Sequence, residues 1–155
     1  MSLETRESQL RVEWTINAPT ARVWESLTTP SHLAQWLGKL VSGEISSESS
    51  FAVDHGDGYQ CDSTVVECEP FRALSYSWKF PDEPHTELSW NLLSSDNRTT
   101  LTLTHSGLSE LLTSYRDGWP VHLTFLEAST LGTPLPWTMF WHFHSTIAYL
   151  NARDQ

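Results

Sequence analysis

Six short segments between residues 39 and 105 have strand character, several of them alternate apolar and polar residues, and turn-forming residues separate them. Alternation places successive side chains on opposite faces of a strand, so the alternating segments predict strands with one buried face. Gly56-Asp57-Gly58 and Ser94-Ser95-Asp96-Asn97 are the clearest turns. Connections this short join antiparallel neighbours. The sequence therefore predicts an antiparallel meander with strands near 39–46, 50–54, 59–69, 72–80, 86–94 and 98–105.

The segments before this meander predict one more strand and two short helices. Leu10–Ala18 alternates as a half-buried strand does. Helical spacing then follows Pro19 as far as Thr28, and a second short helix is expected from Thr29, which can cap it, to Gly38.

The segments after the meander return to helical spacing. Apolar residues at this spacing run from Leu108 to Leu126, where Gly118 and Pro120 predict a break or kink, with Pro120 in the opening turn of the longer piece. The run of Gly132 to Pro136 ends this helix, and Trp137–Leu150 predicts a further amphipathic helix.

Length and charge limit the classes of function. A chain of 155 residues is the size of one ordinary domain. Nine basic against nineteen acidic residues give a formal net charge of −10, which argues against a nucleic-acid partner and against docking on an anionic membrane. No apolar run approaches the length of a membrane span, and Met1–Ser8 lacks the apolar core of a secretion signal. We therefore expect a cytoplasmic protein.

An ordered set of local motifs resembles a known family. The set is Ile16-Asn17-Ala18-Pro19 followed by Val23-Trp24, then Leu33-Ala34-Gln35-Trp36, Val66-Glu67-Cys68-Glu69-Pro70, Leu74-Ser75-Tyr76-Ser77-Trp78 and Gly118-Trp119-Pro120. With the order of elements, it resembles the START-like (SRPBCC, helix-grip) superfamily and, within it, the family named for activators of the heat-shock protein 90 ATPase. The resemblance covers a domain at 8–131. Residues 132–155 form an extension, expected to be helical and packed on the same domain or at an interface.

The resemblance implies an α+β helix-grip fold, in which a curved antiparallel sheet of six to seven strands wraps round a long C-terminal helix, with two short helices after strand one. It also implies an apolar chamber between the sheet and the helix. The inward faces of the expected strands and helices favour the same chamber. From those faces we nominate ten candidate ligand-binding residues: Trp36, Trp78, Phe80, Trp90, Leu92, Leu103, His105, Tyr115, Trp119 and Leu123.

Polar residues give weaker signals. His105 ends a strand on its apolar face, where it could orient a ligand or act as a structural histidine with satisfied nitrogens. The run Asp54-His55-Gly56-Asp57-Gly58 lacks the regular ligand ladder of a calcium loop, so we interpret it as a hairpin connection. His142 and His144 point in different directions on a helix and make a poor metal pair. No activated nucleophile or phosphate loop is recognisable, so we expect no metal, no cofactor and no catalytic residue that can be named.

Three hypotheses of function remain open from the sequence. The first is a non-catalytic module that binds an apolar or amphipathic small molecule, such as a lipid, in the chamber. The second, implied by the family name, is protein interaction as a chaperone cofactor in the stress response. The third is an enzyme like the polyketide cyclases and aromatases of other START-like branches. His105 within hydrogen-bonding reach of a buried carboxylate or hydroxyl facing open volume would favour this hypothesis. The aromatic tail from Trp137 to Trp141 could lid the chamber, pack on the sheet or form a homodimer contact.

Overall fold

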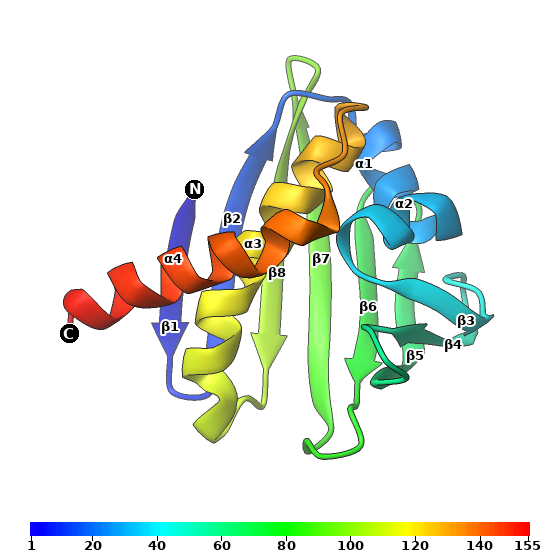
Figure 1. Cartoon of the computed structure of the whole chain (residues 1–155). Helices are drawn as coiled ribbons and strands as arrows, with labels where there is room; N and C mark the ends of the chain where they lie inside the picture. Colours follow the sequence, from blue (N-terminus) through cyan, green and yellow to red (C-terminus); the bar gives the residue numbers. More distant parts are fainter.

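All eight strands of the computed structural model, which describes residues 1–155, belong to one open antiparallel sheet of order β1-β2-β8-β7-β6-β5-β4-β3 (Figure 1). The strands are β1 Ser2–Arg6, β2 Gln9–Ile16, β3 Lys39–Gly43, β4 Ser50–Asp54, β5 Gln60–Glu69, β6 Ala73–Trp78, β7 Thr86–Ser95 and β8 Arg98–Ser106. The α-helices are α1 Thr20–Thr28, α2 Pro30–Trp36, α3 Leu112–Thr130 and α4 Phe140–Arg153. Two 3-10 turns, η1 Ser109–Leu111 and η2 Trp137–Met139, precede α3 and α4.

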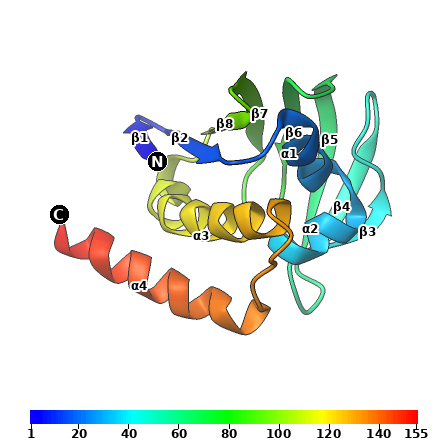
Figure 2. The same ribbon diagram turned by 90° about the horizontal axis from the view of Figure 1, so that it is seen from above.

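The sheet curves round α3, and α4 lies on the side of α3 that faces away from the sheet (Figure 2). The molecule therefore has three layers: sheet, long helix and tail helix. The short helices α1 and α2 close one end of this arrangement, where α2 packs against α3. No helix is both long enough and apolar enough to cross a membrane.

Alternation and turn chemistry explain the central hairpin. In β7, Leu88 and Trp90 are fully buried and alternate with exposed or half-buried neighbours, and Leu101 and Leu103 of β8 face the same core. The two strands join through Asp96 and Asn97, whose φ values of 50° and 62° are those a two-residue hairpin turn requires. The inner face of the sheet thus becomes one apolar surface against which α3 packs.

The predicted fold class is confirmed, with one strand beyond the expected six to seven. The additional strand, β1, pairs antiparallel with β2 along the edge of the sheet. Only Leu3 of β1 is half-buried, and the other four residues are exposed. Backbone hydrogen bonds rather than a buried face hold this strand, so it leaves no alternation in the sequence.

The predicted break at Pro120 is wrong, because α3 runs without interruption from Leu112 to Thr130. Proline removes the hydrogen bond to the carbonyl four residues earlier, that of Arg116. Trp119, Pro120 and Val121 are all buried, however, so packing on both sides of the proline holds the helix together. Pro120 is an interior residue of the helix and not part of an opening turn.

The tail follows the predicted pattern, with a turn from Trp137 and a helix from Phe140. Phe140 is buried, with its ring centroid 5.5 Å from that of Phe125 and 4.8 Å from that of His122, both in α3. The tail helix is therefore attached to the domain through an aromatic contact with the long helix.

Candidate functional site

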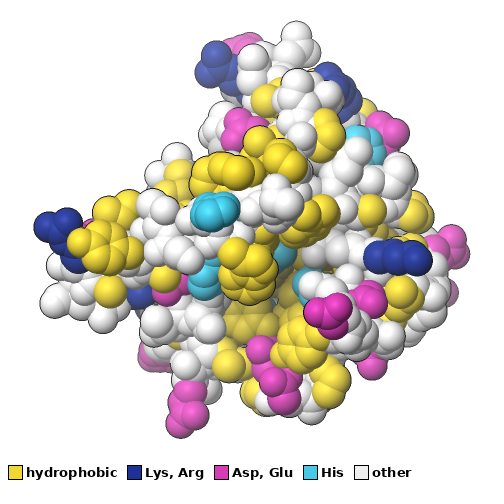
Figure 3. Space-filling view, in the orientation of Figure 1, with side chains coloured by type: hydrophobic (Ala, Val, Ile, Leu, Met, Phe, Trp, Pro, Cys, Tyr) yellow, Lys and Arg dark blue, Asp and Glu magenta, His cyan; other side chains and the backbone are white.

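A cavity of about 400 Å³ lies where the sheet, α3 and the tail meet, and its mouth is partly open to solvent. The sheet and its hairpins contribute His55, Tyr59, Trp78, Phe80 and Glu83. Helix α3 contributes Ser114, Tyr115, Gly118, Trp119 and His122. The remaining walls come from Leu37, Trp137, Phe140, Trp141 and His144. Figure 3 shows hydrophobic and histidine side chains gathered round this hollow where α4 crosses the molecule.

Aromatic faces form most of the inner wall. The rings of Trp78 and Trp119 lie 5.5 Å apart, and Phe80 packs edge-on to Trp78 at 5.7 Å. Tyr59 stacks almost parallel on Phe80, with ring centroids 4.3 Å apart, and its hydroxyl donates to Asp82. These contacts hold the rings in fixed positions, so the apolar wall is formed before any ligand enters.

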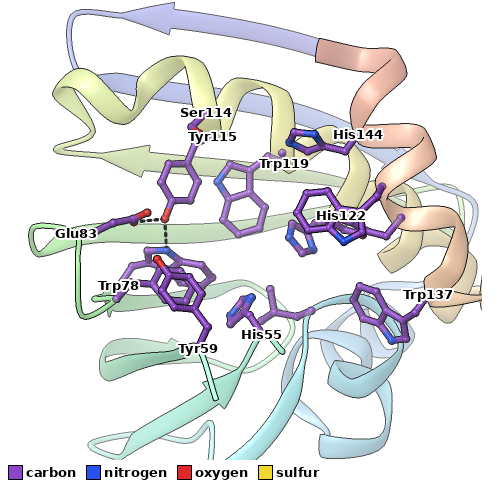
Figure 4. Close-up of a pocket in the computed structure, with 15 residues that line it drawn as sticks. His55, Tyr59, Trp78, Glu83, Ser114, Tyr115, Trp119, His122, Trp137 and His144 are labelled. Carbon is purple, nitrogen blue, oxygen red and sulfur yellow. Dashed lines mark hydrogen bonds between the residues drawn. The ribbon is translucent and has the colours of Figure 1, made fainter. Parts of the chain in front are cut away.

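A hydrogen-bonded chain crosses one end of the cavity (Figure 4). Trp78 Nε1 donates to the Tyr115 hydroxyl at 2.9 Å, and that hydroxyl donates to the Glu83 carboxylate. Burial, and then the bond to Glu83, raise the pKa of Tyr115 far above its ordinary value. Tyr115 therefore keeps its proton and acts as a fixed polar group.

His122 is a neutral imidazole with a defined tautomer. Its Nδ1 lies 2.8 Å from the backbone carbonyl oxygen of Trp36, which can only accept, so Nδ1 carries the proton. Burial lowers the pKa of His122 to about 4, the carbonyl bond opposes this shift, and nearby His144 adds to it. Nε2 consequently holds a free lone pair, and no protein group donates to it.

His55 lies beside His122, with ring centroids 6.4 Å apart, and its ring packs against Phe80 at 4.9 Å and Trp78 at 5.6 Å. Its Nε2 is buried and has no hydrogen-bond partner. Burial is the main cause that lowers the pKa of His55 to about 3; His122 lowers it further, and Asp54 opposes the shift. The ring is therefore uncharged at neutral pH.

His105 lies behind the cavity wall. Trp119 Nε1 donates to its Nδ1 at 3.0 Å, so Nε2 carries the proton and donates to Thr86 Oγ1 at 2.9 Å. The Thr86 hydroxyl in turn donates a hydrogen bond to the backbone carbonyl oxygen of Trp78 at 3.2 Å. Burial lowers the pKa of His105 to about 3. With both nitrogens satisfied, His105 is a structural histidine that orients Trp119.

Four of the ten nominated residues line the cavity: Trp78, Phe80, Tyr115 and Trp119. The other six are packed in the core and have no place in its lining: Trp36, Trp90, Leu92, Leu103, His105 and Leu123. All ten face the interior between sheet and helix. The inner surface is wider than the cavity, so facing inward does not distinguish a lining residue from a core residue.

The sequence interpretation missed the lining residues that come from turns and from the tail. His55 and Tyr59 flank the turn of the β4–β5 hairpin, which we interpreted as a connection only. In the tail, His144 lines the cavity whereas His142 is exposed, as their spacing on a helix dictates. Trp141 lines the cavity although it is 69% exposed, so it stands at the mouth. Helical aromatic spacing from Trp137 was the only available signal for this wall.

The lining has no arrangement suited to a metal ion, since no three histidine, cysteine or acidic side chains in the chain lie together as a ligand set. Chemically, the site offers aromatic surface, one carboxylate paired with a tyrosine, and neutral imidazoles. Such a site can hold and orient an organic molecule.

Comparison with known proteins gives one family and several similar structures. The family model described as "Activator of Hsp90 ATPase homolog 1-like protein" matches residues 17–130. A comparison with curated proteins finds no match. The crystal structure of CalU16 from Micromonospora echinospora has a TM-score of 0.78 and 24% identity, and the match covers 98% of this chain and 94% of that one.

Two further structures share the fold. DynU16, a protein in the dynemicin biosynthetic locus, has a TM-score of 0.75 and 30% identity over 83% of this chain, and the match covers 49% of DynU16. This chain therefore spans about half the length of DynU16. The Aha1 dimer from Colwellia psychrerythraea has a TM-score of 0.67 and 20% identity, over 79% of this chain and 95% of that one.

Proposed function

The chain belongs to the family of activator of Hsp90 ATPase homolog 1-like proteins, and from that premise we propose that its cavity binds an apolar or amphipathic small molecule. The observation that carries the proposal is the cavity of about 400 Å³ with fixed aromatic walls. Pockets for organic molecules usually fall between about 300 and 1,000 Å³ and combine apolar walls with a few polar groups. The chain has this combination in Trp78, Phe80 and Trp119 beside Tyr115 and His122.

The relatives support a small molecule more than a chaperone as the partner. DynU16, at 30% identity, is a protein in the dynemicin biosynthetic locus, a setting that favours a small-molecule ligand. The Aha1 dimer gives no separate support to the chaperone-cofactor hypothesis, since its 20% identity carries the fold alone. The enzyme hypothesis gains no support from His105, because its partners Thr86 and Trp119 hold it in the core and not beside open volume.

A single glycine allows a direct test. Gly118 lines the cavity, and a Cβ added there would meet no atom within 4 Å. Its backbone is helical, so a side chain is compatible with the fold. Gly118→Phe should therefore place a ring inside the cavity without displacing the wall, and Gly118→Ala is the matched control that fills little of the space.

The probe is N-phenyl-1-naphthylamine, an uncharged fluorophore, titrated into each variant. We expect saturable binding of the fluorophore to the natural chain and to Gly118→Ala. The dissociation constant from the fluorescence titration should be at least tenfold higher for Gly118→Phe. Thermal melting is the check that both variants are folded. The absence of saturable binding to the natural chain, or equal binding by a folded Gly118→Phe, contradicts the proposal.

A further inference from the structure

We propose that the cavity selects uncharged aromatic ligands bearing a hydroxyl group, which donates to the bare Nε2 of His122, and that it discriminates against carboxylates. The inference rests on the proposed function, because it names the ligand class of that same cavity. Its basis is the tautomer that the fold imposes on His122 and the charge of the groups around the cavity. Figure 4 shows His122 among the side chains that line the cavity.

The acceptor is fixed by the backbone. The carbonyl of Trp36 holds the Nδ1 proton of His122 at 2.8 Å, so the ring cannot present Nε2–H to the cavity without breaking that bond. Trp119 and Phe140 pack on the ring at 5.6 and 4.8 Å and keep it from turning. His122 lines the cavity, and its Nε2, unlike that of His55, is not a buried atom without a hydrogen-bond partner but remains accessible. A ligand reaching this nitrogen must therefore bring a hydrogen-bond donor.

The body of the ligand is defined by the walls next to this acceptor. The Trp119 ring adjoins both His122 and Trp78, at 5.6 and 5.5 Å between centroids. Trp119 is 1% exposed and meets the cavity only at an edge, so a planar ring system that fills the space beside it would place a substituent at His122. Aromatic rings gain from such offset or edge contacts beyond their buried area.

The charges around the cavity account for the expected discrimination against carboxylates. No lysine or arginine lines the cavity, and the acidic lining residue Glu83 accepts from Tyr115. Lys79 is adjacent, but its ammonium donates to the backbone carbonyls of Phe80 and Glu83. Asp82 and Asp54 lie beside Tyr59 and His55 at the same rim. A carboxylate ligand would lose its hydration without meeting a free cation, which is costly.

Three naphthalenes that differ in one substituent test the selection: 2-naphthalenemethanol, its methyl ether and 2-naphthoate. Calorimetric titration is carried out at pH 8, where His55 and His122 are neutral because burial lowers their pKa values to about 3 and about 4. We expect the alcohol to bind about fivefold more tightly than the ether, the size of one neutral hydrogen bond. We expect 2-naphthoate to bind at least tenfold more weakly than the alcohol. If none of the three binds, the proposed function fails; if the alcohol and the ether bind equally well, only this inference fails.

Variants and a spectroscopic measurement assign the acceptor. His122→Phe keeps an aromatic ring against Phe140 and should bring the alcohol-to-ether ratio close to one, whereas His142→Phe, at an exposed position of α4 outside the lining, should leave the ratio unchanged. Retention of the preference by His122→Phe, or its loss in His142→Phe, overturns the assignment.

Because His122→Phe also loses the bond to Trp36, nitrogen NMR of the unaltered chain provides a test that does not depend on a variant. The His122 ring should show a protonated Nδ1 and a bare Nε2, and the Nε2 signal should shift on addition of the alcohol and stay in place on addition of the ether. A protonated Nε2 in the free protein overturns the inference.

Discussion

At the scale of single residues, His55 Nε2 is the one buried side-chain nitrogen or oxygen in the chain that lacks a hydrogen-bond partner. His55→Phe removes this nitrogen and keeps a ring against Trp78 and Phe80. An unsatisfied buried polar group costs about 1 to 3 kcal/mol, so we expect the free energy of unfolding to rise by about 1 kcal/mol. Urea denaturation at pH 7.5 measures it.

The control for this variant is His142→Phe, an exchange of the same two residue types at an exposed position of α4. It should change the free energy of unfolding by less than about 0.5 kcal/mol. A lower urea midpoint for His55→Phe, with the control unchanged, would mean that Nε2 makes a hydrogen bond in solution.

The buried histidines also predict how stability depends on pH. The pKa values of His55 and His105 are lowered to about 3 and that of His122 to about 4, from about 6.5 in the unfolded chain. Below pH 6.5 these three histidines therefore become protonated in the unfolded chain but stay neutral in the folded chain. Stability should be unaffected by these groups above pH 7 and fall as the pH drops from 6.5 towards 4, by up to about 1.4 kcal/mol per unit for each histidine.

Urea midpoints at pH 7.5 and pH 5.5 check this dependence, and the window lies above the range in which carboxylates titrate. The natural chain should lose stability at pH 5.5, and His55→Phe should lose less because it has one histidine fewer. An equal or higher midpoint at pH 5.5 for the natural chain would contradict the lowered pKa values.

The contrast between His105 and His55 explains which residues the sequence could identify. His105 continues the alternation of Leu101 and Leu103, so its inward direction was predictable. Its partners, Thr86 and Trp119, belong to other elements, 19 and 14 residues away in sequence, so its structural role was not predictable. His55 follows β4 in a turn, outside any periodic pattern, and only the folded hairpin brings it to the cavity.

At the scale of elements, local pattern predicted most strands and failed where tertiary packing decides. The hairpin of β7 and β8 follows from alternation and from the turn at Asp96 and Asn97. The continuous α3 does not follow from local rules, because burial on both sides of Pro120 outweighs the lost hydrogen bond. The edge strand β1 has no buried face and thus gave no signal.

Helix α3 carries a prediction about its glycine. Gly118→Ala should raise the free energy of unfolding by about 1 kcal/mol, since alanine favours the helix and the added methyl meets no atom within 4 Å. The comparison is Gly132→Ala, where φ is +82° and a side chain is strained, so stability should fall. Thermal melting of both variants measures the two opposite shifts. A lower melting temperature for Gly118→Ala would contradict the free space beside this glycine.

At the scale of the whole molecule, the candidate site exists only where three layers meet. The sheet supplies Trp78, the connection that follows it supplies Phe80, α3 supplies Trp119 and His122, and the tail supplies Phe140. The sequence predicted each layer and an apolar interior, but the position of the open volume depends on how the layers are offset. That offset results from packing between distant side chains.

The attachment of the tail gives a prediction at this scale. Phe140→Ala removes the ring that packs on Phe125 and His122, and such deletions cost about 3 to 5 kcal/mol. The loss should fall on α4, so hydrogen exchange should accelerate in residues 140–153 and remain slow in β7 and β8. Trp141→Ala, at a 69% exposed position, is the control and should change exchange little. Uniform acceleration throughout the sheet would contradict a separately anchored tail.

The segment matched by the family ends at residue 130, yet Trp137, Phe140, Trp141 and His144 complete the chamber. One side of the proposed binding cavity thus comes from a stretch of chain that follows both the sheet and the long helix. We expect mutations at these four tail positions to alter the proposed ligand preference while leaving the sheet unchanged. By the same reasoning, exchanging this tail between homologous domains should exchange their selectivity.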